Sequence, residues 1–203
     1  MIEKTFQLQD KPEYQDKGEG YLLDAHVYKD SVMVLLEHLK NTDIYHDYQI
    51  KPLLFLFRHF IELKLKGLIL YSSNAFPNSI ENIEEFMGEA RTTHNLMKLL
   101  NKLKDIKIPR IKLPKDFTIF ITHLDRLDND SVRFRYPENS IGSEFYVTDP
   151  IYIQNKKFFD EIMQLKNIAK HIETVTEILE NLETCLDYEK ENCHENIRNN
   201  QDH

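Results

Sequence analysis

The chain has 203 residues, of which 41% are hydrophobic and 30% are charged, and it contains only five glycines and seven prolines. A chain of this size and composition is expected to fold as one globular domain with a high helix content. Its formal net charge of −8 excludes a protein that mainly coats nucleic acid, because such binding requires many lysines and arginines. A small local basic site stays compatible with this charge.

The N-terminal sequence and the cysteines indicate the compartment. The first residues, MIEKTFQLQDKPEYQ, contain no apolar run of the kind found in a signal peptide. The apolar stretch from Leu53 to Tyr71 carries five ionisable side chains, which are too costly for a lipid-facing membrane span. Cys185 and Cys193 have neither the spacing of a zinc site nor the density of a secreted disulfide scaffold. The sequence therefore predicts a cytoplasmic protein that does not bind a membrane.

Apolar residues at helical spacing predict the helices of the first two thirds of the chain. Residues 1–18 show no periodicity and are expected to form an N-terminal arm. The helix at 47–71 is apolar almost all round and is therefore expected to be the most buried element. The predicted helices are 21–39, 47–71, 79–89, a helix that follows an N-cap at Thr92 or Thr93 and carries Leu96, Leu99, Leu100 and Leu103, and 115–127.

The period of the apolar residues changes after the turn-forming residues 128–130. In SVRFRYPENSIGSEFYV, apolar residues alternate with arginines, and a second short apolar run, EFYV, follows a loop. This pattern predicts a small β-hairpin or an ordered loop inserted into the helical chain.

The longest predicted helix runs from Ile151 to about Tyr188. Its apolar residues step by alternating intervals of three and four, which is a packing seam of heptad type. A helix of this length would exceed about 50 Å, so part of it is expected to pack against another copy of the chain or to project beyond the bundle. The alternative is a helix buried wholly within its own bundle. Residues 189–203 are polar and are expected to form a C-terminal tail.

The central helix carries polar residues within its apolar sequence LLFLFRHFIELKLKGLILY. On a helical wheel, Arg58, His59, Glu62 and Lys66 fall within one sector about 100° wide. The spacing of four from Arg58 to Glu62 and from Glu62 to Lys66 allows ion pairs along the helix. Two interpretations stay open. The sector is either the solvent-facing edge of a mostly buried helix or a paired polar network within the bundle, or it is the wall of a pocket.

These residue types also suit chemistry on a phosphodiester. A histidine can transfer a proton near neutral pH, a guanidinium can hold a phosphate, and a carboxylate can orient the imidazole. Such groups can cleave RNA without a metal, when a base activates the ribose hydroxyl and a cation stabilises the phosphate. His94, at an expected helix N-terminus that favours anions, and Arg135, held by Tyr136 and Pro137, are expected to complete the site. Taken singly, each would also fit a surface residue.

Three segments together resemble the HEPN-like superfamily of bacterial proteins. They are RHFIELKLKGLIL, THNLMKLL and DRLDNDSVRFRYPEN, and the resemblance covers roughly residues 47–140. Members of this superfamily are helical bundles and are commonly dimeric. The resemblance implies a metal-independent ribonuclease of a toxin–antitoxin, abortive-infection or antiphage system, although other members are non-catalytic.

The sequence departs from the usual HEPN ribonuclease motif, an arginine and a polar residue followed after four to six residues by a histidine. Arg58 and His59 are directly adjacent. The segment RNNQDH fits the motif with Arg198 and His203, but no apolar helix follows it, and we interpret it as a chance match. A nuclease site in this chain would therefore be a variant one.

The sequence thus predicts an all-α protein, a helical bundle with a small β-hairpin or ordered loop insertion and a long C-terminal helix. Residues 19–188 would form the HEPN-like domain, and two copies would form a homodimer through the long C-terminal helix. The predicted function is metal-independent RNA cleavage or RNA binding in bacterial defence, with an RNA substrate, a regulatory protein partner and no cofactor. The predicted catalytic residues are Arg58, His59, Glu62, His94 and Arg135.

Two other functions are weighed against this one. A metal site could use His59 and Glu62, three apart on one helical face, with a ligand from His94, His123 or Asp125, but Arg58 would oppose a bound cation. A non-catalytic helical adaptor would instead bind a partner protein through its apolar seam, and its acidic charge would suit a basic partner.

Overall fold

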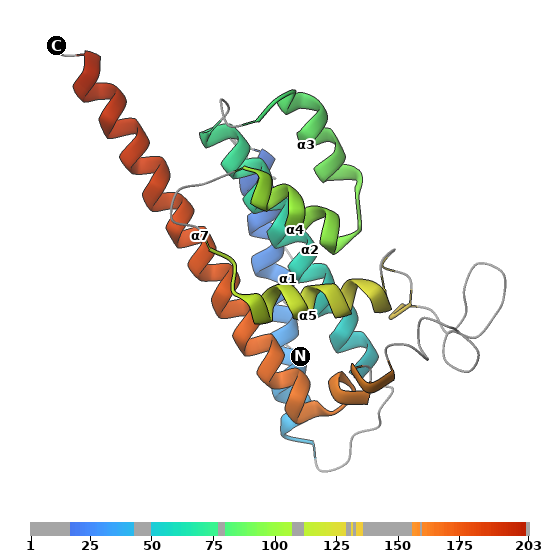
Figure 1. Ribbon diagram of the computed structural model, residues 1–203. Helices are drawn as coiled ribbons and strands as arrows, with labels where there is room; N and C mark the ends of the chain where they lie inside the picture. Colours follow the sequence, from blue (N-terminus) through green and yellow to red (C-terminus); the bar gives the residue numbers. More distant parts are fainter. Residues whose placement is uncertain are drawn as a thin grey trace, which may run out of the picture.

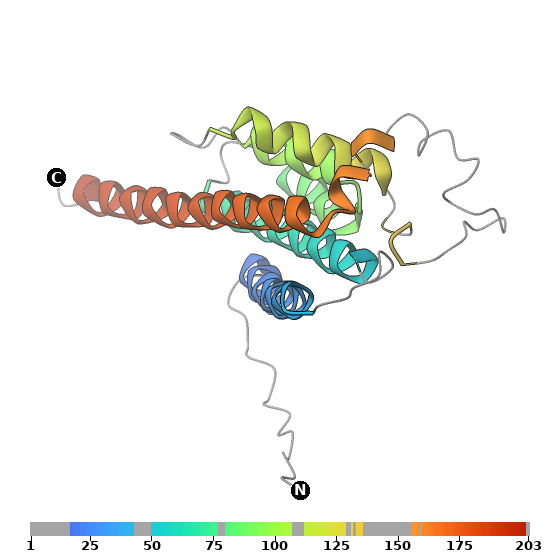
Figure 2. The ribbon, with the colours of Figure 1, turned by 90° about the horizontal axis from the view of Figure 1, so that it is seen from below.

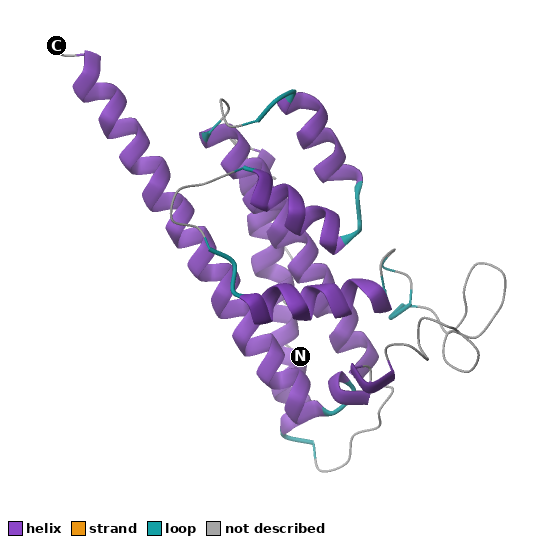
Figure 3. Cartoon of the chain, in the orientation of Figure 1, coloured by secondary structure: helices purple, strands orange, loops and turns teal. Residues whose placement is uncertain are grey.

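The chain forms an all-α bundle (Figure 1). The computed structural model describes residues 17–42, 50–76, 80–106, 112–128, 131, 133–135, 156–158 and 160–201. Within these residues every regular element is helical, and no strand is present (Figure 3). The helices are α1 (Lys17–Lys40), α2 (Ile50–Ala75), α3 (Ile83–Thr92), α4 (Leu96–Asp105), α5 (Lys115–Leu127) and α7 (Leu165–Gln201).

Helix α2 is the centre of the bundle, as its apolar sequence predicts. It packs against α1, α3, α4 and α7, and seen from below it lies between α1 on one side and α5 on the other (Figure 2). The crossing of α1 and α2 is close because of two glycines. A Cβ atom at Gly18 would lie 2.6 Å from the backbone nitrogen of Tyr71, and one at Gly67 would lie 2.7 Å from the side chain of Leu22.

The predicted helix positions agree with the structure apart from their ends. Helix α5 has the predicted bounds, and α1, α2 and α3 are each displaced by a few residues at one or both ends. The predicted cap of α4 is wrong. Asn95, and not Thr92 or Thr93, caps this helix, because its side chain accepts a hydrogen bond from the backbone N–H of Lys98 at 2.7 Å.

The long C-terminal helix is present, but it differs from the prediction at both ends. Short helical stretches at 156–158 and 160–162 are separated from α7 by a turn at Met163 and Gln164. Helix α7 then continues to Gln201, beyond the predicted end at Tyr188, and its last part projects past the other helices (Figure 1). The part of the predicted seam that lies in α7 beyond its first turn is buried within one chain, where α7 packs against α1 and α2, and its residues are Ala169, Ile172, Val175, Leu179, Leu182 and Leu186.

Only part of the predicted hairpin or ordered loop lies within the described residues. Ser131 forms a bend and 133–135 form a turn, with Arg133 and Phe134 buried and Arg135 exposed. The two arginines therefore do not share one side, as they would in a strand. The remaining residues of this segment lie outside the described part of the chain.

A separate finding concerns membranes. Among the helices that the structure describes, none combines the length and the apolar character that crossing a bilayer requires.

Candidate functional site

Arg58 is completely buried, and all three of its guanidinium nitrogens have partners. Nε donates to the backbone carbonyl of Asp128 at 2.8 Å, Nη2 donates to the backbone carbonyl of His94 at 2.7 Å, and Nη1 lies 3.0 Å from Oε2 of Glu62. Nε also lies 3.3 Å from the Asp128 carboxylate. Arg58 therefore ties α2 to the end of α5 and to the connection between α3 and α4, and in this arrangement it does not reach a phosphate.

Glu62 is the anion at the centre of this network. It is 1% exposed, and its Oε1 accepts a hydrogen bond from Nζ of Lys66 at 2.9 Å. Burial alone would raise the pKa of Glu62, but the hydrogen bond from Lys66, the charges of Lys66 and Arg58, and the hydrogen bond from His94 together lower it. Glu62 is therefore ionised at neutral pH although it is buried.

His94 connects the buried carboxylate to the surface. Its Nδ1 lies 2.9 Å from Oε1 of Glu62, and its side chain is 59% exposed. Because an ionised carboxylate only accepts hydrogen bonds, Nδ1 of His94 must carry the hydrogen. In the neutral ring the other nitrogen, Nε2, then has a lone pair that can accept a proton. This arrangement of a carboxylate and an imidazole is that of a general base held in one tautomer.

The carboxylate of Asp125 occupies the N-terminus of α4, where it leaves no room for a bound anion. Asp125 of α5 accepts hydrogen bonds from the backbone N–H of Leu96 at 2.7 Å and from the side chain of Asn95 at 3.0 Å. Burial raises the pKa of Asp125, and these hydrogen bonds and the charge of Arg58 partly offset that rise. The expectation that free N–H groups beside His94 would attract a phosphate is therefore wrong.

His59 and Arg135 form a second group around Phe55. The His59 ring stacks on Phe55 at a centroid distance of 5.9 Å and meets Tyr28 edge-on at 4.4 Å. The guanidinium of Arg135 lies 5.6 Å from the centre of the Phe55 ring. Burial lowers the pKa of His59, and the positive charges of Arg58, Lys66 and Arg135 lower it further. The negative charge of Glu62 raises this pKa but does not outweigh the other effects. His59 is therefore neutral at pH 7.

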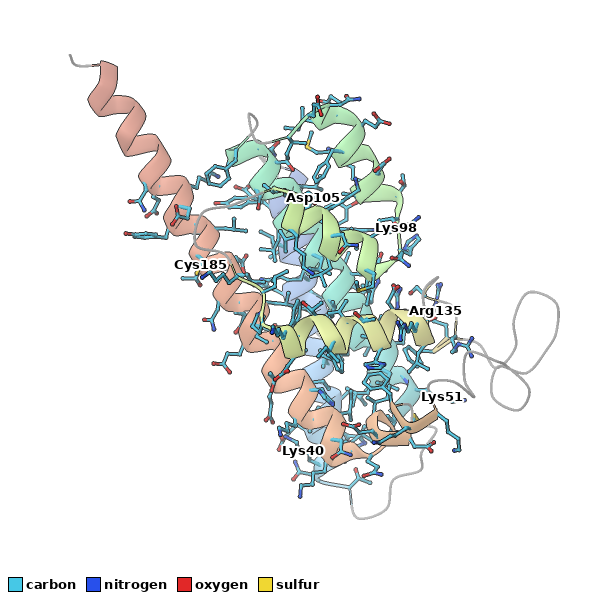
Figure 4. All side chains as sticks on the ribbon, viewed as in Figure 1. Lys40, Lys51, Lys98, Asp105, Arg135 and Cys185 are labelled. Carbon is cyan, nitrogen blue, oxygen red and sulfur yellow. The ribbon has the colours of Figure 1, made fainter. Side chains whose placement is uncertain are left out.

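The five predicted catalytic residues thus divide into two groups. Arg58, Glu62 and His94 are in direct contact, whereas His59 and Arg135 meet through Phe55. Arg135 lies at the end of α5, along the same edge of the molecule as Lys51 and Lys98 (Figure 4). Of these three cations, Lys98 stands four residues after His94 in the sequence, in the first turn of α4. The segment with Arg198 and His203 has no described side chains.

Two of the candidate metal ligands make other contacts. Asp125 accepts a hydrogen bond from the backbone N–H of Leu96, and the His123 ring stacks on Phe158 at 4.9 Å. Among the residues that the structure describes, no group of three or more histidines, cysteines and carboxylates could hold a metal ion.

The ionisation of Glu62 should make the free energy of unfolding depend on pH. Its pKa is lowered in the folded state from an ordinary value of 4.5, so its contribution is present at neutral pH and is lost as the pH falls below 4.5. We expect Glu62→Gln to lower the free energy of unfolding at pH 7 by about 2 kcal/mol, since Lys66 and Arg58 lose their buried counter-charge. Urea unfolding should show this difference narrowing as the pH falls below 4.5.

Glu89→Gln is the matched control for that experiment. Glu89 is an exposed carboxylate paired with Lys102 at 2.6 Å, and the Lys102 hydrogen bond and charge lower its pKa as well. Because this pair is solvated at the surface, its loss should change stability much less. Equal effects of the two substitutions at pH 7 would contradict a special role of the buried carboxylate.

The chain was compared with known proteins. No family model matches it, and neither a curated protein nor a solved structure is significantly similar to it.

Proposed function

We propose that this protein cleaves or binds RNA without a metal and that His94 is the proton-transfer residue at its site. The observation that supports the proposal is the contact of 2.9 Å between the exposed imidazole of His94 and the buried, ionised carboxylate of Glu62. A carboxylate in this position fixes the tautomer and stabilises the imidazolium that forms when the ring accepts a proton.

The chemistry would proceed by transfer within the RNA. Nε2 of His94 removes the proton of a ribose 2′-hydroxyl, and the 2′-oxygen forms a bond to the adjacent phosphorus. The bond from phosphorus to the 5′-oxygen of the next nucleotide breaks, and that oxygen takes a proton from water. The hydroxide formed removes the proton from Nε2 of His94, which returns the ring to its neutral form. The products are a 2′,3′-cyclic phosphate and a 5′-hydroxyl, and no metal or redox partner takes part.

The phosphate needs a cation, and we assign this role to Lys98 rather than to the buried Arg58. Lys98 is exposed, stands four residues after His94 in the sequence, and lines a surface hollow of about 550 Å³ to which Lys102 also contributes. Arg58 is instead a positioning residue, since it holds the backbone carbonyl of His94 and the carboxylate of Glu62. Arg135 and the neutral His59 would contact RNA beyond the cleaved bond.

The resemblance to HEPN-like proteins also suggests a biological role for the proposed activity. It suggests a bacterial defence or toxin–antitoxin protein that acts in the cytoplasm as a homodimer and under the control of a regulatory partner. Because the seam of α7 is buried within one chain up to Leu186, a dimer through this helix would use its outer face or its projecting end.

The test is cleavage of RNA by the purified protein in the presence of a chelator. We expect an oligoribonucleotide to be cut, and the same oligonucleotide with 2′-deoxyribose at the cut position to stay intact, because the nucleophile is then missing. Mass spectrometry should identify the cyclic phosphate. Cleavage that stops with the chelator, or cleavage of the deoxy substrate, would contradict the mechanism.

A non-catalytic adaptor is the second candidate, and an exposed apolar stripe on α1 favours it. The stripe consists of Leu23, Val27 and Val34, which are 46%, 58% and 72% exposed and share one side of the helix. The opposite side of α1 packs on the bundle. An adaptor would cut no RNA, and it would lose its partner when Val34 is replaced by Glu while His94→Ala leaves the complex intact.

A further inference from the structure

A second site lies between α5, the short helical stretches at 156–158 and 160–162, and the first turns of α7. In Figure 1 these three elements meet below α5. They line an open cavity of about 580 Å³, a size typical of sites for small organic ligands. None of the predicted catalytic residues lines it, and we call it the ring pocket.

Four aromatic rings in contact form the wall of the ring pocket. The His171 ring stacks on Phe120 at a centroid distance of 4.6 Å, Phe120 meets Phe158 edge-on at 5.8 Å, and Phe158 stacks on His123 at 4.9 Å. Nδ1 of His123 is buried and has no hydrogen-bond partner in the described part of the chain. A buried ring nitrogen without a partner is rare, and a ligand in this cavity could supply one.

The rim of the ring pocket carries charges of both signs. Lys157 and Lys170 are cationic, and Asp116 and Glu161 are anionic. Glu161 lies 3.5 Å from Nε2 of His171, whereas Lys157, Lys170 and Asp116 have no ion-pair partner among the described residues. The rim therefore carries two positive and two negative side chains, which could pair with the carboxylate and the ammonium of one molecule.

We propose that the ring pocket binds an aromatic amino acid. The aromatic side chain would lie against Phe158 and His123, the carboxylate would face Lys157 and Lys170, and the ammonium would face Asp116 and Glu161. A purely apolar ligand would leave the four charges unused, and a ligand with one charge would satisfy only half of them. This proposal is independent of the proposed action on RNA.

The absence of tryptophan from the sequence makes a direct test simple. Indole fluorescence can be excited where the ten tyrosines absorb little, so that L-tryptophan reports its own binding to the full chain. We expect a saturable change in its fluorescence. N-acetyl-L-tryptophan, which lacks the ammonium, and tryptamine, which lacks the carboxylate, should each bind about tenfold more weakly, because each loses a hydrogen bond to a charged group.

Variants assign the binding to the ring pocket. Lys170→Gln should weaken L-tryptophan about tenfold, and Phe158→Ala should weaken it as well. Lys166→Gln is the matched control, since Lys166 is an exposed lysine of the same helix that does not line the cavity. Circular dichroism should show an unchanged helix content in all three variants.

Three results would overturn the proposal. The first is equal affinity for the three indoles, which would show that the charges on the rim do not select the ligand. The second is an equal effect of Lys170→Gln and Lys166→Gln. The third is the absence of saturable binding at millimolar concentration for L-tryptophan by fluorescence and for L-phenylalanine and L-tyrosine by calorimetry.

Discussion

His94→Ala should lower the rate of RNA cleavage by about 10² to 10⁴, the range by which a positioned acid or base accelerates proton transfer. The side chain is 59% exposed and is not part of the apolar core, so the fold should persist. Glu62 would keep its contacts with Lys66 and Arg58. Single-turnover rates on one oligoribonucleotide, with wild type and variant at equal concentration, measure the effect.

A rescue experiment separates proton transfer from structure. Free imidazole should restore part of the activity of His94→Ala, because it can enter the space of the missing ring and accept the proton. His38→Ala is the matched control, since His38 is an exposed histidine in the last turn of α1. An unchanged rate in His94→Ala, or equal losses in both variants, would refute the assignment of His94.

Arg58→Met should lower the free energy of unfolding by about 3 to 5 kcal/mol, which is typical of breaking a buried ion pair by removing one partner. Methionine is apolar and cannot donate to the backbone carbonyls of Asp128 and His94, which Arg58 reaches at 2.8 Å and 2.7 Å. Glu62 would also lose one of its two cations. Urea denaturation followed by circular dichroism measures the change, which is large beside the total stability of a typical domain.

Two further variants make this result specific. Arg126→Met removes an exposed arginine of α5 and should have little effect. Arg58→Lys keeps the charge but cannot reproduce the fork of donors, so it should recover only part of the lost stability, and it serves for the measurement if Arg58→Met yields no folded protein. A change of less than about 1 kcal/mol in both Arg58 variants would show that the network does not stabilise the fold.

Three residues of the polar sector on α2 fit the interpretation as a paired polar network. Arg58 and Lys66 belong to a buried ion-pair network, as the spacing of four residues allows. His94 places one end of that network at the surface, 32 residues further along the chain than the carboxylate it contacts. The network and the exposed imidazole are thus parts of one arrangement, in which buried charges hold an accessible ring.

The helices could be predicted from the sequence alone, because the apolar periodicity that specifies a helix extends over only a few turns of one segment. This local information was enough for the all-α class, for the bounds of α5 and for the burial of α2. It also indicated the pairs from Arg58 to Glu62 and from Glu62 to Lys66, since one helix fixes both ends of each pair.

The contacts of these side chains with residues far away in the sequence could not be predicted and become visible only in the folded chain. Arg58 donates a hydrogen bond to the backbone carbonyl of Asp128, 70 residues away in the sequence, and Asp125 accepts one from the backbone N–H of Leu96, 29 residues away. Likewise, the seam of α7 contains no sign of whether its partner is the same chain or another copy. Such contacts depend on the angles at which helices cross, and those angles follow from the packing of the whole core rather than from the spacing of residues along one helix.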